Sequence, residues 1–204
     1  MSPRKIEFHP LTRERWTDLA RLFGPRGACG GCWCMWWRLA AAEFTRGKGE
    51  RNRRALRRIV ERGPPPGILA YAAGEPVGWC AFGPRGDYPR LARSRVLAAL
   101  DEQPVWSITC FFVAKPWRGQ GLTRRLVRAA EREARARGAR VLEAYPVDTS
   151  GGALPDPFVY TGLPSTFEKA GFRELARRSR TRPILRKPLR GARSSRPRSP
   201  AARR

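Results

Sequence analysis

The chain has 204 residues, enough for one domain with a hydrophobic core, and its seven tryptophans and 41% hydrophobic content exclude wholesale disorder. A net charge of +25 invites comparison with nucleic-acid-binding proteins. Most of the 42 basic residues are arginine, however, and Ala, Gly and Pro are abundant, so a compositional bias is the favoured explanation.

The composition also bears on location and boundaries. No run of about 18 apolar residues and no N-terminal signal pattern occur, so the sequence predicts a soluble, cytoplasmic protein without a membrane partner. We expect a single domain over residues 1–187 and a disordered tail, rich in Arg, Ser and Pro, over residues 188–204. The aromatic residues cluster with cysteines rather than with basic residues, so nucleic acid is not the expected partner.

The first predicted elements are a short strand at residues 5–8 and a helix from residue 12 to about residue 23. His9 and Pro10 are expected to break the strand, and Thr12 can cap the helix. His9 is the only histidine, and we interpret it as a turn residue rather than a catalyst.

A cysteine- and tryptophan-rich stretch follows at residues 29–38, which read Cys-Gly-Gly-Cys-Trp-Cys-Met-Trp-Trp-Arg. A zinc site needs four soft ligands, and no fourth ligand lies nearby in the sequence. A structural disulfide is not expected in a cytoplasmic chain. Two interpretations stay open: thiols that pack as small hydrophobic groups, or a patch that faces a substrate.

The middle of the chain alternates between helical and extended patterns. Residues 40–63 are compatible with helix, interrupted near Gly47 and Gly49, and the Pro-rich residues 64–67 end them. Residues 68–73 and 76–82 are predicted to form a β-hairpin that points Trp79 and Cys80 to opposite faces. Residues 83–104 form a long connection, within which a helix is predicted at residues 91–100.

The most informative unit is a strand, a glycine-containing turn and a helix. Residues 107–113 are an apolar run typical of a strand buried on both faces, and Pro116 closes it. Gly119 and Gly121 lie in the turn, and an amphipathic helix is predicted from Leu122 to about residue 138. Such a turn presents backbone N–H groups at a helix N-terminus, where an anion such as a pyrophosphate binds favourably. The glycines alone are equally typical of an ordinary turn between a strand and a helix.

The remaining pattern predicts three further strands and a short helix. The strands are expected at residues 140–145, 172–177 and 182–187, and the helix at residues 165–170. Residues 148–157 are predicted to form a loop, and residues 158–162 are ambiguous.

Two motifs in this region resemble those of the GNAT-type N-acetyltransferases. Arg118-Gly119-Gln120-Gly121-Leu122-Thr123 is similar to the coenzyme A motif (Arg/Gln)-x-x-Gly-x-(Gly/Ala), with Thr123 in place of the last small residue. Residues 167–172, Phe-Glu-Lys-Ala-Gly-Phe, look like the family's Tyr-x-x-x-Gly-Phe. The two motifs occur in the family's order, and the resemblance spans residues 68–187.

The resemblance implies a GNAT-type α/β fold, in which helices flank a central mixed, largely antiparallel twisted sheet. It also implies acetyl-CoA as co-substrate. The implied coenzyme contacts are made by the central strand and by the turn that follows it, that is by Phe111, Val113, Arg118, Gly119, Gln120, Gly121, Leu122 and Thr123.

The resemblance places the segment after the first helix on the acceptor side of the active site. We therefore favour a substrate-binding wall, formed by Cys32, Trp33, Trp36 and Trp37, over a metal site. The expected acceptor is a primary amine of a small molecule or a protein, and the basic body of the chain favours a neutral or anionic one. The oligomeric state stays open, with a homodimer as one alternative.

The general acid does not carry over, because the family's tyrosine is replaced by Phe167, which is expected to place a bare ring edge near the thioester sulfur. Tyr160 and Tyr145 are the candidate replacements, and Glu143 is a weaker candidate base. A second hypothesis follows from the missing hydroxyl. The fold could serve as a non-catalytic module that binds coenzyme A or an acidic partner.

Overall fold

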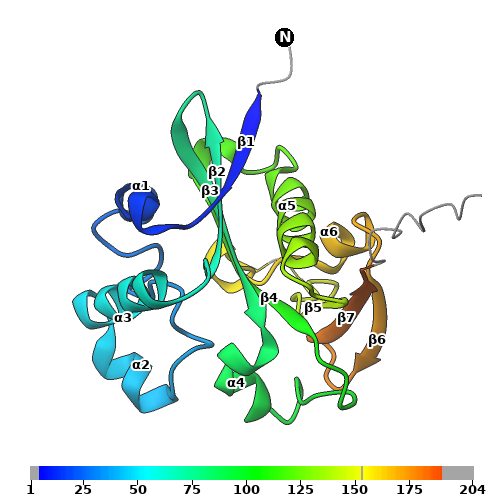
Figure 1. The fold of residues 1–204 in the computed structure, drawn as a ribbon. Helices are drawn as coiled ribbons and strands as arrows, with labels where there is room; N and C mark the ends of the chain where they lie inside the picture. Colours follow the sequence, from blue (N-terminus) through cyan, green and yellow to red (C-terminus); the bar gives the residue numbers. More distant parts are fainter. Residues whose placement is uncertain (1–4, 153, 190–204) are drawn as a thin grey trace, which may run out of the picture.

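The computed structural model describes residues 5–152 and 154–189, which form one seven-stranded sheet flanked by helices (Figure 1). The strand order is β1-β2-β3-β4-β5-β7-β6. Of the neighbouring pairs, β4 and β5 run parallel and the others antiparallel. The mixed, largely antiparallel sheet expected from the sequence is therefore confirmed.

The elements follow in chain order. The strands are β1 (Ile6–Pro10), β2 (Gly67–Ala72), β3 (Glu75–Pro84), β4 (Trp106–Val113), β5 (Val141–Ala144), β6 (Arg173–Arg177) and β7 (Pro183–Pro188). The α-helices are α1 (Trp16–Phe23), α2 (Ala41–Gly47), α3 (Glu50–Arg62), α4 (Pro89–Ala92), α5 (Leu122–Ala136) and α6 (Pro164–Glu168). Short 3-10 turns are η1 (Arg13–Arg15), η2 (Arg85–Asp87), η3 (Lys115–Trp117) and η4 (Asp156–Phe158).

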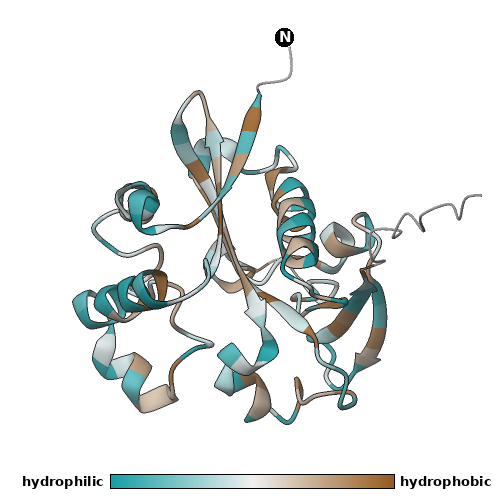
Figure 2. Cartoon of the chain, viewed as in Figure 1, coloured by the Kyte–Doolittle hydropathy of each residue, from teal (hydrophilic) through white to brown (hydrophobic). Residues whose placement is uncertain are grey.

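The two faces of the sheet carry separate hydrophobic clusters. Helices α5 and α6 cover one face and α1 and α3 the other, and hydrophilic residues lie along the outer sides of α3 and α5 (Figure 2). Cys80 belongs to the α5 cluster and Trp79 to the α1 cluster, as the alternation along β3 predicted. Strand β4 contributes Ile108 and Phe111 to one cluster and Cys110 to the other, so it is buried on both faces.

Helix α5 lies close to the sheet because β3 has a glycine beneath it. A Cβ atom on Gly78 would lie 3.1 Å from a methyl carbon of Leu122 and 3.2 Å from one of Leu126. Both leucines are buried, and they form the apolar stripe that the sequence pattern predicted. The close approach fixes the N-terminus of α5 next to the end of β4.

Three sequence-based boundaries are corrected by the structure. Strand β1 continues through His9 and Pro10, which pair with Leu69 and Ile68; it is an edge strand, where a proline costs no ladder hydrogen bond. The helix expected at residues 91–100 is only the short α4, since its pattern is overridden by the packing of Leu91 and Leu97 in a third hydrophobic cluster.

The third correction concerns the last strand, which was predicted at residues 182–187. Pro188 lies in β7, and Leu189 donates a backbone hydrogen bond to Arg140 O at 2.7 Å, so the backbone pairing continues past residue 187. The rest of the predicted tail, residues 190–204, lies outside the described residues. No helix in the described part of the chain has the length and apolar character needed to span a bilayer.

Candidate active site

The parallel strands β4 and β5 separate soon after they begin to pair. Their register covers Trp106 to Ile108 on β4, and beyond Ile108 the strand has lost β5 as a neighbour. The Ala114 N–H donates to Val77 O at 3.0 Å, and because successive backbone groups alternate in direction, the Val113 N–H points to the open side. This edge is the natural place for an extended ligand to lie along β4.

A loop segment occupies part of the open edge. The Phe111 N–H, which also points to that side, donates to Tyr160 O at 2.6 Å, and the Val147 N–H donates to Gly162 O at 2.9 Å. Residues 160–162 therefore lie between β4 and the chain that follows β5. The sequence left this segment ambiguous. Of the two expected β4 contacts, Phe111 already donates its N–H to Tyr160 O, which leaves the Val113 N–H for a ligand.

The turn after β4 has the shape of an anion site. Gly119 and Gly121 adopt φ values of 71° and 73°, and a Cβ atom on either would meet nothing within 4 Å. Gly121 is the N-cap of α5, and no described side chain caps this helix. The first N–H groups of a 15-residue helix thus face open space, where the helix dipole favours a phosphate.

Two side chains of this turn donate hydrogen bonds to nearby backbone carbonyls. Arg118 Nε donates to Val113 O at 3.0 Å, and Gln120 Nε2 donates to Pro116 O at 2.7 Å. Gln120 lies outside the cavity described next, whereas the other residues expected to contact the coenzyme lie in its wall. The residues present therefore fit a pyrophosphate held by backbone groups.

One cavity of about 1120 Å³ connects this turn to the cysteine- and tryptophan-rich loop. At the coenzyme end it is lined by the turn and by β4 from Cys110 to Val113. At the other end it is lined by Cys29, Cys32, Cys34, Trp36, Trp37, Phe44, Arg90 and Ser94. The loop at residues 157–163 and Arg182 close the remaining side. The volume suffices for a ligand with two parts.

Of the three tryptophans in the loop, two line the cavity and one packs against helix α1. Trp36 and Trp37 line the cavity, and Trp36 is 38% exposed. Trp33 lies outside the lining: it is buried, stacks on Trp16 with ring centroids 5.9 Å apart, and packs against Gly27. Trp33 thus holds the loop on α1, whereas its neighbours face the cavity.

The loop thiols are packed and partly hydrogen-bonded. Cys34 Sγ lies 3.0 Å from Cys110 Sγ on β4 and accepts a hydrogen bond from Trp79 Nε1 at 3.0 Å. Burial and the neighbouring Cys34 raise the pKa of Cys32 to about 11, so this thiol is protonated at neutral pH. No three Cys, His, Asp or Glu residues in the described part of the chain are arranged to hold a metal ion.

Of the two candidate tyrosines, Tyr160 lines the cavity and Tyr145 does not. The pKa of Tyr160 is raised mainly by burial, and the nearby Arg182 partly offsets that effect. Arg182 is held in place by hydrogen bonds from Nη1 to Tyr145 O at 3.2 Å and to Thr161 Oγ1 at 3.0 Å. Tyr160 therefore keeps its proton at neutral pH and can act as a hydrogen-bond donor.

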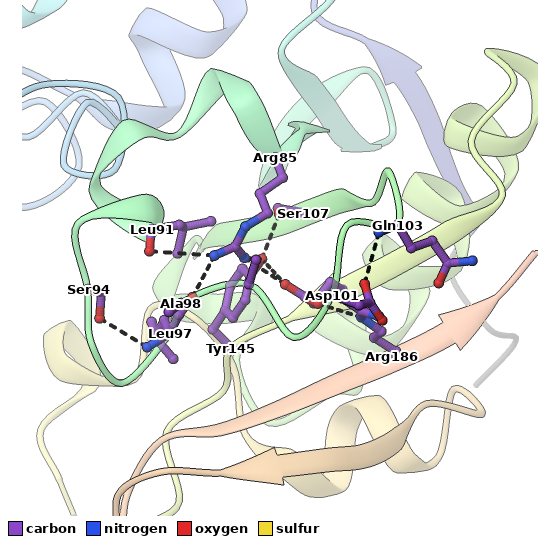
Figure 3. A network of polar contacts seen from close by, with 12 residues as sticks. Arg85, Leu91, Ser94, Leu97, Ala98, Asp101, Gln103, Ser107, Tyr145 and Arg186 are labelled. Atoms are coloured by element: carbon purple, nitrogen blue, oxygen red, sulfur yellow. Dashed lines mark hydrogen bonds and ion pairs between the residues drawn. The ribbon is translucent and has the colours of Figure 1, made fainter.

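Tyr145 belongs instead to a buried polar network (Figure 3). Its hydroxyl donates to Glu143 Oε1 at 2.6 Å and lies 2.6 Å from Arg85 Nη1 and 2.7 Å from Ser107 Oγ. Glu143 also pairs with Arg186 at 2.6 Å. Neither Tyr145 nor Glu143 lines the cavity, so their fully buried side chains join strands rather than reach a substrate.

Phe167 differs from expectation. Its side chain is fully buried between Phe111 and Phe172, with ring centroids 5.9 and 5.2 Å away, and it lies outside the cavity lining. The family's tyrosine position is thus part of the hydrophobic core here. Sequence reasoning also missed Arg90, Arg182 and Cys110 as cavity residues, and no local motif marks any of them.

A known protein family matches this chain in sequence. The family profile of the acetyltransferase (GNAT) family matches residues 33–153, more than half of the chain. No curated protein matches it in sequence.

Solved structures show the same fold. A putative GNAT-family acetyltransferase from Desulfovibrio desulfuricans has 16% identity and a TM-score of 0.53, covering 91% of this chain and 100% of its own. An N-acetyltransferase from Staphylococcus aureus Mu50 has 14% identity and a TM-score of 0.54, covering 91% and 99%. The PaiA N-acetyltransferase from Thermoplasma acidophilum, solved in complex with coenzyme A, has 14% identity and a TM-score of 0.52, covering 90% and 99%. The chain belongs to the GNAT family of acetyltransferases.

Proposed function

We propose that this protein transfers the acetyl group of acetyl-CoA to a primary amine of a small molecule or a protein, in the cytoplasm. One observation carries the proposal: a single cavity connects an uncapped helix N-terminus to the open edge of β4 and then to an apolar chamber. The helix N-terminus suits a phosphate group, the edge of β4 suits an extended arm, and the apolar chamber suits an amine acceptor.

The residues at the coenzyme end have separate roles in this proposal. The N–H groups of the turn at residues 119–123 bind the pyrophosphate, and the Val113 N–H binds the extended arm. Acetyl-CoA supplies a thioester whose carbonyl carbon accepts the amine and whose thiol departs. Tyr160 lines the same cavity, and its hydroxyl is the group we assign to hydrogen-bond the departing sulfur.

Removal of the amine proton is assigned to water. The described residues of the cavity wall include no Asp, Glu or His, so no side chain there is suited to act as a general base. Arg90 and Arg182 lie in the wall, and positive charge near an amine lowers its pKa and favours the neutral, nucleophilic form.

The test is acetyl-CoA binding by isothermal titration, followed by thiol release with a panel of primary amines. We expect micromolar binding and amine-dependent thiol release. Absence of binding at millimolar acetyl-CoA would remove the proposal.

A second candidate is a non-catalytic module that binds coenzyme A. It is favoured by the absence of a general base among the described wall residues and by Phe167 in the family's tyrosine position. Binding of acetyl-CoA without thiol release for any amine of the panel would support this second candidate. Turnover with any amine of the panel would exclude it.

A further inference from the structure

We propose that the acceptor amine also carries a carboxylate on a largely apolar body, and that Arg90 binds this carboxylate. The inference rests on the proposed function, because it concerns the acceptor end of the same cavity. It goes further by naming the chemistry that distinguishes this acceptor from other amines.

The charge of the cavity wall is the first argument. The charged side chains among its described residues are Arg90, Arg118 and Arg182. Arg118 belongs to the coenzyme turn, which leaves Arg90 and Arg182 beside the acceptor. A purely cationic amine would meet like charge there, whereas an anionic group on the same molecule would be attracted.

Arg90 is held by its surroundings without a carboxylate partner among the described residues. Its guanidinium lies 3.6 Å over the Trp36 ring, and Nη1 donates to Trp36 O at 3.2 Å. Its backbone N–H donates to Trp37 O at 3.3 Å. These contacts fix the side chain against the loop and leave further guanidinium N–H groups for a ligand.

Neighbouring arginines show the contrast. Arg85 is paired with Glu143 at 2.7 Å and Arg38 with Asp87 at 3.6 Å, although all three arginines lie on or against the same connection. Burial lowers the pKa of Arg90, which means that its charge is partly desolvated without an anion to compensate it. A ligand carboxylate would supply that compensation.

The body of the acceptor follows from the rest of the wall. Trp36, Trp37 and Phe44 present aromatic surface to the chamber, and the protonated thiol of Cys32 adds a small apolar group. Trp36, Phe158 and Leu163 are 38%, 63% and 36% exposed, and all three line this cavity. Exposed apolar side chains grouped around one cavity are typical of a ligand-binding groove. An amino acid with an apolar side chain, or a molecule of that chemistry, matches both features.

The reaction balances with such a zwitterionic acceptor. The ammonium group loses one proton to water, and the neutral nitrogen forms a bond to the acetyl carbon. The carbon–sulfur bond of the thioester breaks, the amide nitrogen loses its second proton, and the sulfur takes up one proton as the free thiol. The carboxylate is unchanged and serves only for binding.

The first test compares matched acceptors at saturating acetyl-CoA. Phenylalanine, leucine and tryptophan are each paired with their amides, and phenethylamine provides a ring and an amine without a carboxylate. We expect kcat/KM for the best acid to exceed that of its amide by at least tenfold. Equal or better rates with the amides would overturn the inference and leave the proposed function intact.

Arg90→Gln should lower kcat/KM for that acid by about 10- to 100-fold, mainly through KM, and should change kcat/KM for phenethylamine much less, so that the ratio of the two values falls. Arg90→Lys keeps the charge but loses the planar guanidinium, so its kcat/KM for the acid should lie between those of the parent protein and Arg90→Gln. Arg93→Gln is the matched control, because Arg93 is an exposed residue at the end of the same short helix. An acid preference that survives in Arg90→Gln would overturn the assignment of the anion to Arg90.

A binding measurement keeps the inference testable without turnover. N-acetylphenylalanine and its amide are titrated into the protein with coenzyme A, and tryptophan fluorescence is followed. The acid should bind at least tenfold more tightly than the amide, and Arg90→Gln should abolish the difference. Equal binding of the two products would overturn the inference, whereas failure of coenzyme A itself to bind would instead remove the proposed function.

Discussion

The Phe111 N–H donates a hydrogen bond to Tyr160 O at 2.6 Å, across the gap where β4 and β5 separate. This bond docks the loop at residues 157–163 onto β4 and places Tyr160 in the wall of the cavity. The hydroxyl is therefore positioned by the backbone of the strand that the thioester is proposed to lie along.

Tyr160→Phe should slow acetyl transfer at saturating acetyl-CoA by about 10²-fold, the lower end of what a positioned acid contributes. The dissociation constant of acetyl-CoA should change little, because the backbone bond from Phe111 does not involve the hydroxyl. Stopped-flow or steady-state thiol release measures the first quantity and titration calorimetry the second. A turnover number unchanged by the substitution would assign sulfur protonation to water.

Tyr145→Phe provides the contrast. Its hydroxyl lies in the buried network with Glu143, Arg85 and Ser107, so its removal takes one hydrogen bond from each of these buried groups (Figure 3). The free energy of unfolding should fall by about 1–3 kcal/mol, as seen by urea denaturation. The turnover number of the folded enzyme should stay within a fewfold of the parent value. A large loss of turnover at unchanged stability would place Tyr145 in the chemistry.

Glu143→Gln should be more damaging to stability. Glu143 is fully buried and pairs with Arg85 at 2.7 Å and Arg186 at 2.6 Å, and the substitution leaves two largely buried guanidinium groups without their shared carboxylate. The expected loss is about 3–5 kcal/mol in the free energy of unfolding. Thermal or urea denaturation measures it, and a loss below about 1 kcal/mol would contradict a structural role for the network.

Gly121→Glu should abolish coenzyme binding while the fold is retained. The substitution places a carboxylate at the N-terminus of α5, where phosphate oxygens are expected, and the φ of 73° adds strain. Gly138→Glu is the matched control, because Gly138 has a φ of 84°, open space around a Cβ atom and a position just beyond the other end of α5. Calorimetry with acetyl-CoA should separate the two variants. If both bind equally, the coenzyme site lies elsewhere.

Phe167→Tyr should lower stability rather than raise turnover. The ring is fully buried against Phe111 and Phe172, so a new hydroxyl would have to be buried among apolar groups at a cost of about 1–3 kcal/mol. Urea denaturation and thiol release are measured on the same preparation. A several-fold rise in turnover would show that the ring reaches the thioester after all.

Most of the helices and strands could be predicted from the sequence, because the pattern that indicates each one lies within a short stretch of residues. The apolar run of β4, the glycines of the turn and the apolar stripe of α5 each lie within a few residues of one another, and the structure contains all three. Backbone N–H groups make the coenzyme turn, so its shape follows from where glycine permits a positive φ. The GNAT-type fold could be predicted from these features and from the second motif.

Only the tertiary structure decided which side chains share the cavity. Arg90 and Arg182 are far apart in the chain and line the same cavity as Tyr160 because of the order of the strands and the path of the loop docked on β4. The same packing buries Phe167 in the hydrophobic core and Tyr145 in a polar network. The family motif had placed Phe167 near the thioester, and proximity in sequence had made Tyr145 a candidate general acid. Side-chain convergence depends on long-range packing, which no local pattern records.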